Sequence, residues 1–227
     1  MRLLRQRRLV SMSGGAGAAF TPASIAGLKL WLDASQITGL NDGDAVGTWA
    51  DLSGNGNDAT QATGSKKPTW KTTYVDFDGV DDVMATAAFD PDTTGLTCLV
   101  SGQWDAVANY PMLYSFSIQN EIRLYAGTDG AQGANATGST SPNTSVTLGA
   151  RQNYVFVDTG AALAFYINNV AAGTSGVSSL PGSQVLYLGG RSSAPSFPLN
   201  GRIYKMLVYD TALSPANLAL LNNWLSL

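Results

Sequence analysis

The chain has 227 residues, of which 44% are hydrophobic and only 13% are charged, and its formal net charge is −3. It contains one cysteine and no histidine, which excludes an intrachain disulfide, a Cys/His zinc site and a catalytic set that depends on histidine. Glu121 is the single glutamate, so a hydrolytic site built from two glutamates as acid and nucleophile is excluded. These absences argue against an enzyme.

The basic residues are concentrated at the start of the chain. The first eight residues, MRLLRQRR, hold four arginines, whereas the remainder has nine basic and 16 acidic residues. We therefore predict a basic arm with a Gly/Ala linker over residues 1–19 and one domain over residues 20–227. The arm residues predicted to bind a partner are Arg2, Leu3, Leu4, Arg5, Arg7, Arg8, Leu9 and Val10.

Leucines interleave with the arginines of the arm, which favours docking into an acidic groove of a neighbouring protein. Four charges without an interleaved aromatic residue are a weak footprint for nucleic acid, which we do not expect as a partner. Ser-Met-Ser-Gly-Gly follows Val10 where a secretion signal would continue with apolar residues. No apolar run approaches the roughly 18 residues of a transmembrane helix, so neither a signal peptide nor a membrane span is expected.

Short apolar runs between turn residues, together with 25 glycines, predict an all-β domain. The strands are expected at about residues 28–32, 46–49, 72–79, 83–89, 96–104, 111–117, 122–126, 153–158, 163–167, 185–188 and 201–210. Asn168-Asn169 is predicted to form a hairpin turn. Residues 130–145 contain almost no large apolar side chain, which predicts a surface loop.

The last predicted strand places Tyr204, Met206 and Val208 on one face. Ile203 and Leu207 would then lie on the other face, so either both faces are covered or a bulge intervenes. After this strand the spacing becomes helical. Ser214 is expected to cap a helix that begins at Pro215, with an apolar stripe formed by Leu218, Leu221, Trp224 and Leu225.

Three segments together resemble the laminin-G-like, concanavalin A-like jelly-roll domains found in many virion proteins of tailed phages. They are GLKLWLDAS with the following W-DLSGNGNDATQ, then VDFDGVDD, then NGRIYKMLVYDTALSPANLALLNNWL. The resemblance implies a two-sheet antiparallel jelly-roll sandwich with a short C-terminal helix and an extended N-terminal arm. It also implies a virion part, because phage members often carry a basic or Gly-rich segment ahead of the domain.

We therefore predict a non-enzymatic virion structural protein, displayed on the capsid as a decoration protein or on the tail, and anchored by its arm to the major capsid or tail protein. It is expected to form a homo-oligomer, such as a trimer. The alternative is an adhesion module that binds a host surface glycan, with Trp104 and Tyr110 as an exposed aromatic site. A glycan hydrolase that uses two aspartates is ranked below both.

Aspartates are dense in the turns, which raises calcium as an alternative to our expectation of no metal and no cofactor. Asn/Asp-Gly turns need no metal, and no segment fits a twelve-residue calcium loop with a terminal glutamate. The aspartates concerned are Asp42, Asp44, Asp51, Asp58, Asp78, Asp81 and Asp82. Trp31 and Trp224 are expected in the core, where the first strand meets the last helix.

Overall fold

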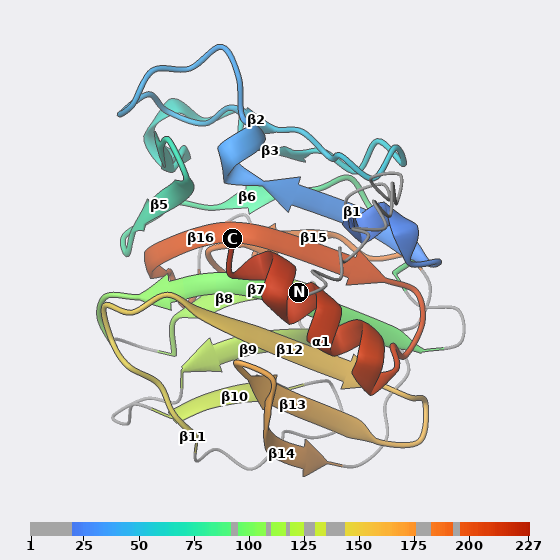
Figure 1. Ribbon diagram of the computed structural model, residues 1–227. Coiled ribbons are helices and arrows are strands. Elements are labelled where there is room, and N and C mark those ends of the chain that lie inside the picture. The colour runs from blue at the N-terminus through green and yellow to red at the C-terminus, as the bar shows by residue number, and fades with distance from the viewer. Residues whose placement is uncertain are drawn as a thin grey trace, which may run out of the picture.

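A computed structural model describes residues 20–91, 95–107, 110–116, 119–124, 130–134, 144–175, 183–192 and 196–227. These residues form two antiparallel sheets packed face to face and one short C-terminal helix (Figure 1). The predicted jelly-roll sandwich is confirmed. No helix in the described ranges is long and apolar enough to span a membrane.

The first sheet, sheet A, runs in the order β14 (Val170–Ser175), β13 (Leu163–Ile167), β12 (Gln152–Asp158), β7 (Leu96–Trp104), β16 (Asn200–Tyr209), β5 (Tyr74–Asp78) and β4 (Thr69–Lys71), and β1 (Leu28–Asp33) also pairs with β16. Sheet B runs in the order β11 (Thr144–Ser145), β10 (Gly130–Ala134), β9 (Gln119–Leu124), β8 (Met112–Phe116), β15 (Leu186–Leu188), β6 (Met84–Ala85), β3 (Ala59–Thr60) and β2 (Thr48–Trp49). Three short 3-10 helices occur at η1 (Pro22–Ser24), η2 (Ala34–Gln36) and η3 (Gly64–Lys66), and α1 spans Pro215–Leu225.

Most predicted strands are present, and the Asn168-Asn169 turn joins β13 to β14 with both residues at positive φ, as a two-residue hairpin requires. The predicted loop at 130–145 is wrong at both ends, where β10 and β11 pair with each other. Strand pairing is made by backbone groups that every residue carries, so the absence of large side chains does not exclude it. Residues 135–143 lie outside the described part of the chain.

Strand β16 is central in sheet A because it pairs with β7 along one edge and with both β5 and β1 along the other. Its register with β7 shifts between Ile203 and Lys205, so Tyr204 is an extra residue in the strand. The bulge reverses the face of every later side chain, and the predicted grouping of Tyr204 with Met206 is wrong. The side chains of Ile203, Met206 and Val208 pack between the sheets, whereas Leu207 and Tyr209 pack under α1.

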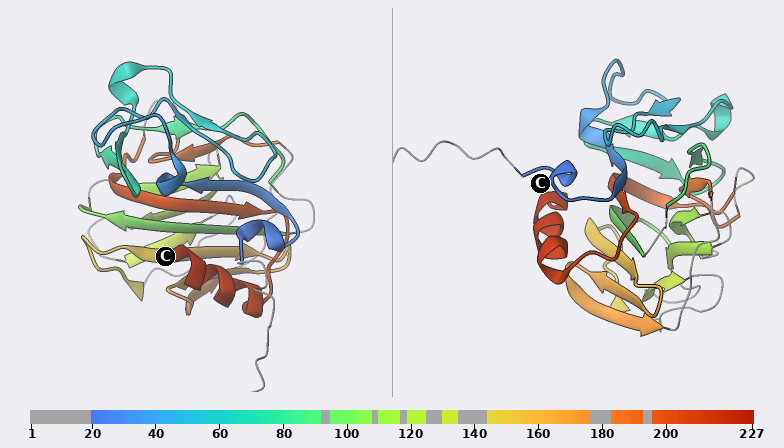
Figure 2. Two further views of the ribbon diagram at one scale, coloured as in Figure 1. Left: turned by 45° about the horizontal axis from the view of Figure 1, so that its top comes forward. Right: turned by 90° about the vertical axis from the view of Figure 1, so that its right-hand side faces the viewer.

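Helix α1 begins as predicted, because Ser214 Oγ accepts a hydrogen bond from the backbone N–H of Asn217. Its leucine stripe covers the outer face of sheet A, where the helix lies across the strands (Figure 2). At its C-terminal end, Arg151 Nη2 donates to the carbonyl of Leu225 and Lys205 Nζ donates to that of Trp224. Two cations from the sheet therefore satisfy carbonyls that the helix leaves free.

The edge of β1 that faces away from β16 is covered by side chains of the loop that follows β2. Asp51 Oδ1 accepts a hydrogen bond from the backbone N–H of Trp31 at 2.9 Å. Asn57 Nδ2 donates to the carbonyl of Lys29 at 2.9 Å, and Asn55 Nδ2 donates to the same carbonyl at 3.1 Å. The loop thus takes the place of a neighbouring strand, which protects this edge and fixes β1 in position.

Candidate functional site

An open pocket of about 590 Å³ lies on the outer face of sheet A beside the end of α1. Alternation along β1 turns Trp31 and Asp33 to this outer face, because Leu30 and Leu32 are buried between the sheets. The 3-10 helix η2 follows directly, since the Asp33 carboxylate accepts from both the backbone N–H and the Oγ of Ser35. The pocket is lined by Thr21, Trp31, Asp33, Ser35, Gln36, Leu52, Lys205, Trp224 and Leu227.

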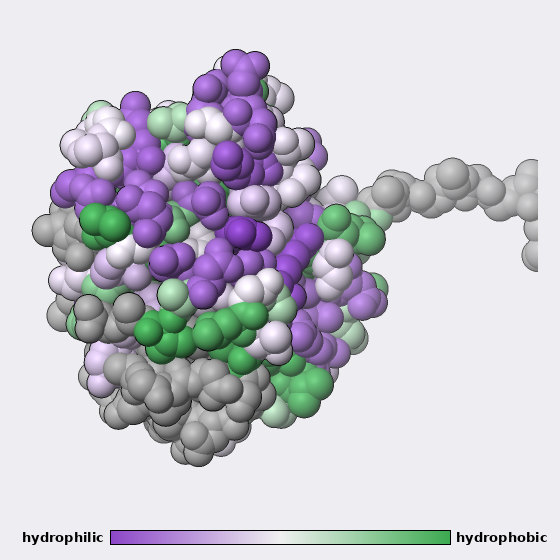
Figure 3. Space-filling view, turned by 90° about the vertical axis from the view of Figure 1, so that its left-hand side faces the viewer, coloured by the Kyte–Doolittle hydropathy of each residue, from purple (hydrophilic) through white to green (hydrophobic). Residues whose placement is uncertain are grey.

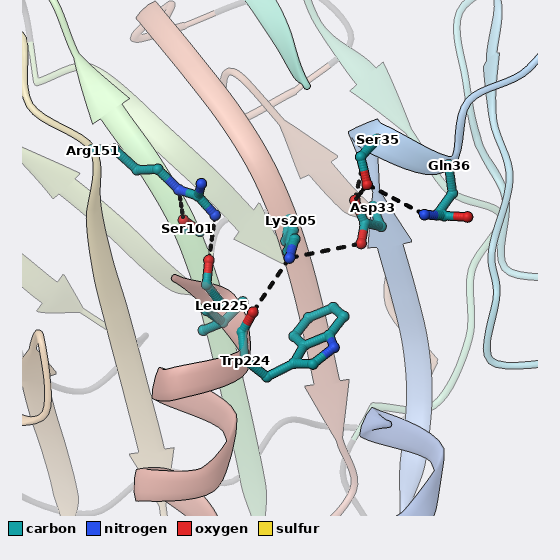
Figure 4. Close-up of polar contacts among 8 residues, drawn as sticks. All are labelled: Asp33, Ser35, Gln36, Ser101, Arg151, Lys205, Trp224 and Leu225. Atoms are coloured by element: carbon teal, nitrogen blue, oxygen red, sulfur yellow. Dashed lines mark hydrogen bonds and ion pairs between the residues drawn. The ribbon is translucent and has the colours of Figure 1, made fainter. Parts of the chain in front are cut away.

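One buried anion and one buried cation meet at the floor of this pocket (Figure 4). Lys205 Nζ lies 3.9 Å from Asp33 Oδ2 and 4.2 Å from the centre of the Trp224 ring. Burial lowers the pKa of Lys205, and the Asp33 carboxylate opposes this shift. Because the two formal charges cancel, the pocket favours a neutral ligand over an ionic one.

Two tryptophans form the aromatic wall of the pocket. The Trp31 and Trp224 rings pack edge to face with their centres 5.6 Å apart, where the first strand meets the last helix as predicted. Both side chains are only half-buried, so they present ring surface to the pocket and do not belong wholly to the core. Trp31 Nε1 is covered and has no hydrogen-bond partner among the described residues.

A smaller cavity of about 110 Å³ adjoins the pocket and shares Asp33, Gln36 and Leu52 with it. Trp49 lines this cavity, and its buried Nε1 also has no hydrogen-bond partner within the described ranges. By contrast, Trp70 Nε1 donates to the carbonyl of Ala34 at 2.9 Å. The two buried indole N–H groups without an acceptor thus belong to tryptophans that line two adjoining cavities.

The aromatic site predicted at Trp104 and Tyr110 is not formed as expected. Trp104 is 1% exposed, its ring packs 4.7 Å from that of Tyr154, and its Nε1 donates to the carbonyl of Pro111. The expectation that Trp104 is exposed is therefore wrong, because it lies at the end of β7, whose side chains are all buried. Tyr110 is half-buried against Phe197 and lines neither of the two cavities.

Sequence reasoning missed Asp33, Gln36 and Lys205 as residues of this site, and it expected Trp31 and Trp224 in the core. The alternation in Leu30-Trp31-Leu32-Asp33 was a usable signal for two side chains on one face. The predicted partner-binding residues of the arm, Arg2, Leu3, Leu4, Arg5, Arg7, Arg8, Leu9 and Val10, lie outside the described residues.

The carboxylates of Asp78, Asp81 and Asp82 lie within 4.8 Å of one another and could hold a cation. Backbone groups already use part of this cluster: Asp78 Oδ1 accepts from the N–H of Val80 and Asp82 Oδ2 accepts from that of Asp78. Asp51 similarly accepts four hydrogen bonds from nearby donors. These hydrogen bonds give the aspartates of both loops a structural role in stabilising the turns, without a bound cation.

The end of the molecule where β16 begins is largely hydrophilic, with a hydrophobic band below it in Figure 3. Among the polar contacts of sheet A, Arg202 Nε lies 3.4 Å from Asp76 Oδ1 and 3.5 Å from Asp105 Oδ2. Burial raises the pKa of Asp76, and Arg202 opposes that shift. These two aspartates are thus the partners of one arginine.

Comparison with known proteins agrees with this architecture. Residues 89–219 match the family model described as the concanavalin A-like lectin/glucanases superfamily, and the chain belongs to that superfamily. No curated protein matches the sequence.

Several solved structures share the fold at low identity. A sialidase of Trypanosoma rangeli, solved with sialic acid, has a TM-score of 0.64 at 17% identity over 87% of this chain, which spans only 33% of the sialidase. Domain 4 of an extracellular GH43 arabinanase of Geobacillus stearothermophilus, solved with arabinotriose, has a TM-score of 0.55 at 16% identity, covering 86% of this chain and 98% of that domain. A heptameric SAP-like pentraxin of Limulus polyphemus has a TM-score of 0.54 at 16% identity, covering 66% of this chain and 81% of the pentraxin chain. At such identities the likeness concerns the fold alone.

The aspartate cluster yields a prediction on pH and stability. Burial, together with the neighbouring Asp78 and Asp81 charges, raises the pKa of Asp82 from 3.8 to about 6. Between these values the folded state holds a proton that the unfolded state releases, so the free energy of unfolding falls as pH rises through this window. Replacing Asp82→Asn keeps an acceptor for the Asp78 N–H and removes the buried charge. Urea unfolding should show the variant to be more stable at pH 7, by up to about 3 kcal/mol, and nearly unchanged at pH 3.5.

Asp42→Asn, at an exposed position, serves as the control. Its free energy of unfolding should match that of the wild-type chain at both pH values. A less stable Asp82→Asn protein at pH 7 would contradict this account, since it would mean that the ionised carboxylate stabilises the fold.

Proposed function

We propose that this domain is a non-enzymatic carbohydrate-binding module and that the pocket beside Trp31 and Trp224 is its sugar site. The observation that carries the proposal is the half-buried pair of Trp31 and Trp224 in the wall of an open pocket whose side-chain charges cancel. The covered Trp31 Nε1 has no hydrogen-bond partner among the described residues. Sugar rings present C–H faces that pack on aromatic rings, and their hydroxyl oxygens accept hydrogen bonds. Gln36, which is exposed at the rim, adds an amide that both donates and accepts.

The same pocket supports binding without chemistry. Asp33 is the one side-chain carboxylate among its described lining residues, whereas glycoside hydrolysis ordinarily needs two carboxyl groups across the scissile bond. Asp76 and Asp105, which lie outside this pocket, are both engaged with Arg202. The arabinotriose bound to the arabinanase domain supports saccharide recognition on this fold rather than any particular site.

The sugar site is tested with two variants in the full chain. Trp224→Ala removes a stacking surface and Gln36→Ala removes an exposed amide, so both should weaken binding of a glycan found by array screening, by about tenfold for Trp224→Ala. Calorimetry measures the affinity, and thermal unfolding checks the fold. Tyr187→Ala, a half-buried aromatic in β15 of the opposite sheet, is the matched control and should bind normally. Wild-type affinity in both pocket variants would overturn the assignment.

A second candidate function is favoured by the charge asymmetry of the sequence. We propose that the domain is displayed on a virion, on the capsid or the tail, as a homo-oligomer whose arm at residues 1–19 docks into an acidic groove of a neighbouring virion protein. Phe20 and Thr21, which follow the arm directly, line cavities on the same side as the sugar pocket.

Deleting residues 1–16 tests this attachment. The shortened protein should remain folded and should bind sugar as the full chain does, but it should no longer join particles assembled without it. Cosedimentation with the particles measures attachment, and a full-length variant with serine at Leu3, Leu4, Leu9 and Val10 separates apolar docking from charge alone. Attachment that survives the deletion would sink the proposal.

A further inference from the structure

The smaller cavity next to the sugar pocket has a composition of its own. Besides Asp33, Gln36 and Leu52, it is lined by Ile37, Thr38, Thr48, Trp49 and Ala50. Its volume of about 110 Å³ is less than a fifth of the 590 Å³ of the larger pocket and exceeds the space that one water needs, so it accommodates a small branch of a ligand. Apolar and hydroxyl-bearing side chains are mixed along its wall.

Two polar groups at this cavity have unused hydrogen-bonding capacity. Trp49 Nε1 is a buried donor without an acceptor among the described residues. Asp33 Oδ2 lies 3.9 Å from Lys205 Nζ, which is longer than a hydrogen bond, whereas Oδ1 carries the two bonds from Ser35. A buried donor and a buried acceptor near one small cavity match a single hydroxyl group, which accepts one hydrogen bond and donates another.

We propose that the smaller cavity receives the exocyclic hydroxymethyl group of a hexopyranose whose ring packs on the tryptophans of the larger pocket. The site therefore selects hexoses over the pentoses that lack this group, an inference that rests on the proposed sugar-binding function. The methylene carbon lies against the apolar wall of Ile37 and Leu52, and the oxygen bonds to Trp49 Nε1 and Asp33 Oδ2. The cavity disfavours a carboxylate in this position because the Asp33 charge repels it.

The Trp49 N–H is covered in this structure, so the occupant reaches it after a small side-chain displacement, which is common when ligands bind. A site that hydrogen-bonds a hydroxyl discriminates strongly against an analogue without it, because its polar groups are then left unpaired. The discrimination expected from a partly open cavity is at least about tenfold in affinity.

The test compares pairs of sugars that differ only in the hydroxymethyl group. Methyl β-D-glucopyranoside is paired with methyl β-D-xylopyranoside, and methyl β-D-galactopyranoside with methyl α-L-arabinopyranoside. NMR titration of the full chain should show the hexose of at least one pair binding about tenfold or more tightly than its pentose. Equal affinities within each pair would overturn this inference and leave the proposed function standing, whereas no binding by any of the four would overturn both.

Two variants test whether the preference for hexoses arises in the smaller cavity. Ala50→Leu fills the cavity from an exposed position, so it should lower hexose affinity to the pentose level and leave pentose binding unchanged. Trp49→Phe removes the N–H and should also reduce the preference for hexose; because Trp49 is buried, its thermal unfolding is measured alongside. A hexose preference that persists in Ala50→Leu would show that the hydroxymethyl group lies elsewhere.

Discussion

The pairing of β1 with β16 is the contact on which the candidate site depends. Its register sets Asp33 opposite Lys205 and Trp31 opposite Leu207, so the buried lysine finds its carboxylate and the tryptophan meets the end of α1. The bulge at Tyr204 is part of the same arrangement, because it decides which side chains of β16 face outward. The loop around Asp51 then holds β1 from its other edge. Loss of this pairing would leave Lys205 buried without its anion, which is costly in a protein interior.

Two covered indole N–H groups without an acceptor raise the free energy of the unliganded site. A buried donor without an acceptor costs about 1 to 3 kcal/mol, so native proteins retain few of them. Trp70 and Trp104 show that this fold can satisfy buried indoles with backbone carbonyls. Trp31 and Trp49 lack that solution among the described residues, and both line the adjoining cavities. A ligand oxygen that accepts from these groups would recover this cost on binding, which would add to the affinity for a sugar.

The sequence predicted those features that depend only on residues close together in the chain. The Ser214 cap, the Asn168-Asn169 hairpin and the limits of β7 follow from neighbouring residues alone. The burial of Trp104 could not be read this way, because alternation gives two faces without saying which of them is covered. The site was hidden for a related reason: it joins β1, η2, β16 and α1, elements from opposite ends of the chain, and only the register of β1 on β16 brings them together.

The role proposed for the covered N–H groups of Trp31 and Trp49, which is to donate to a bound sugar, is tested directly by the indole region of a ¹⁵N-resolved NMR spectrum. The indole signals are assigned with single Trp→Phe variants and followed while a hexoside is added. The Nε1–H signals of Trp31 and Trp49 should move on binding, whereas those of Trp70 and Trp104, already bonded to backbone carbonyls, should stay in place. A saturable sugar interaction that leaves the Trp31 and Trp49 signals unmoved would contradict it.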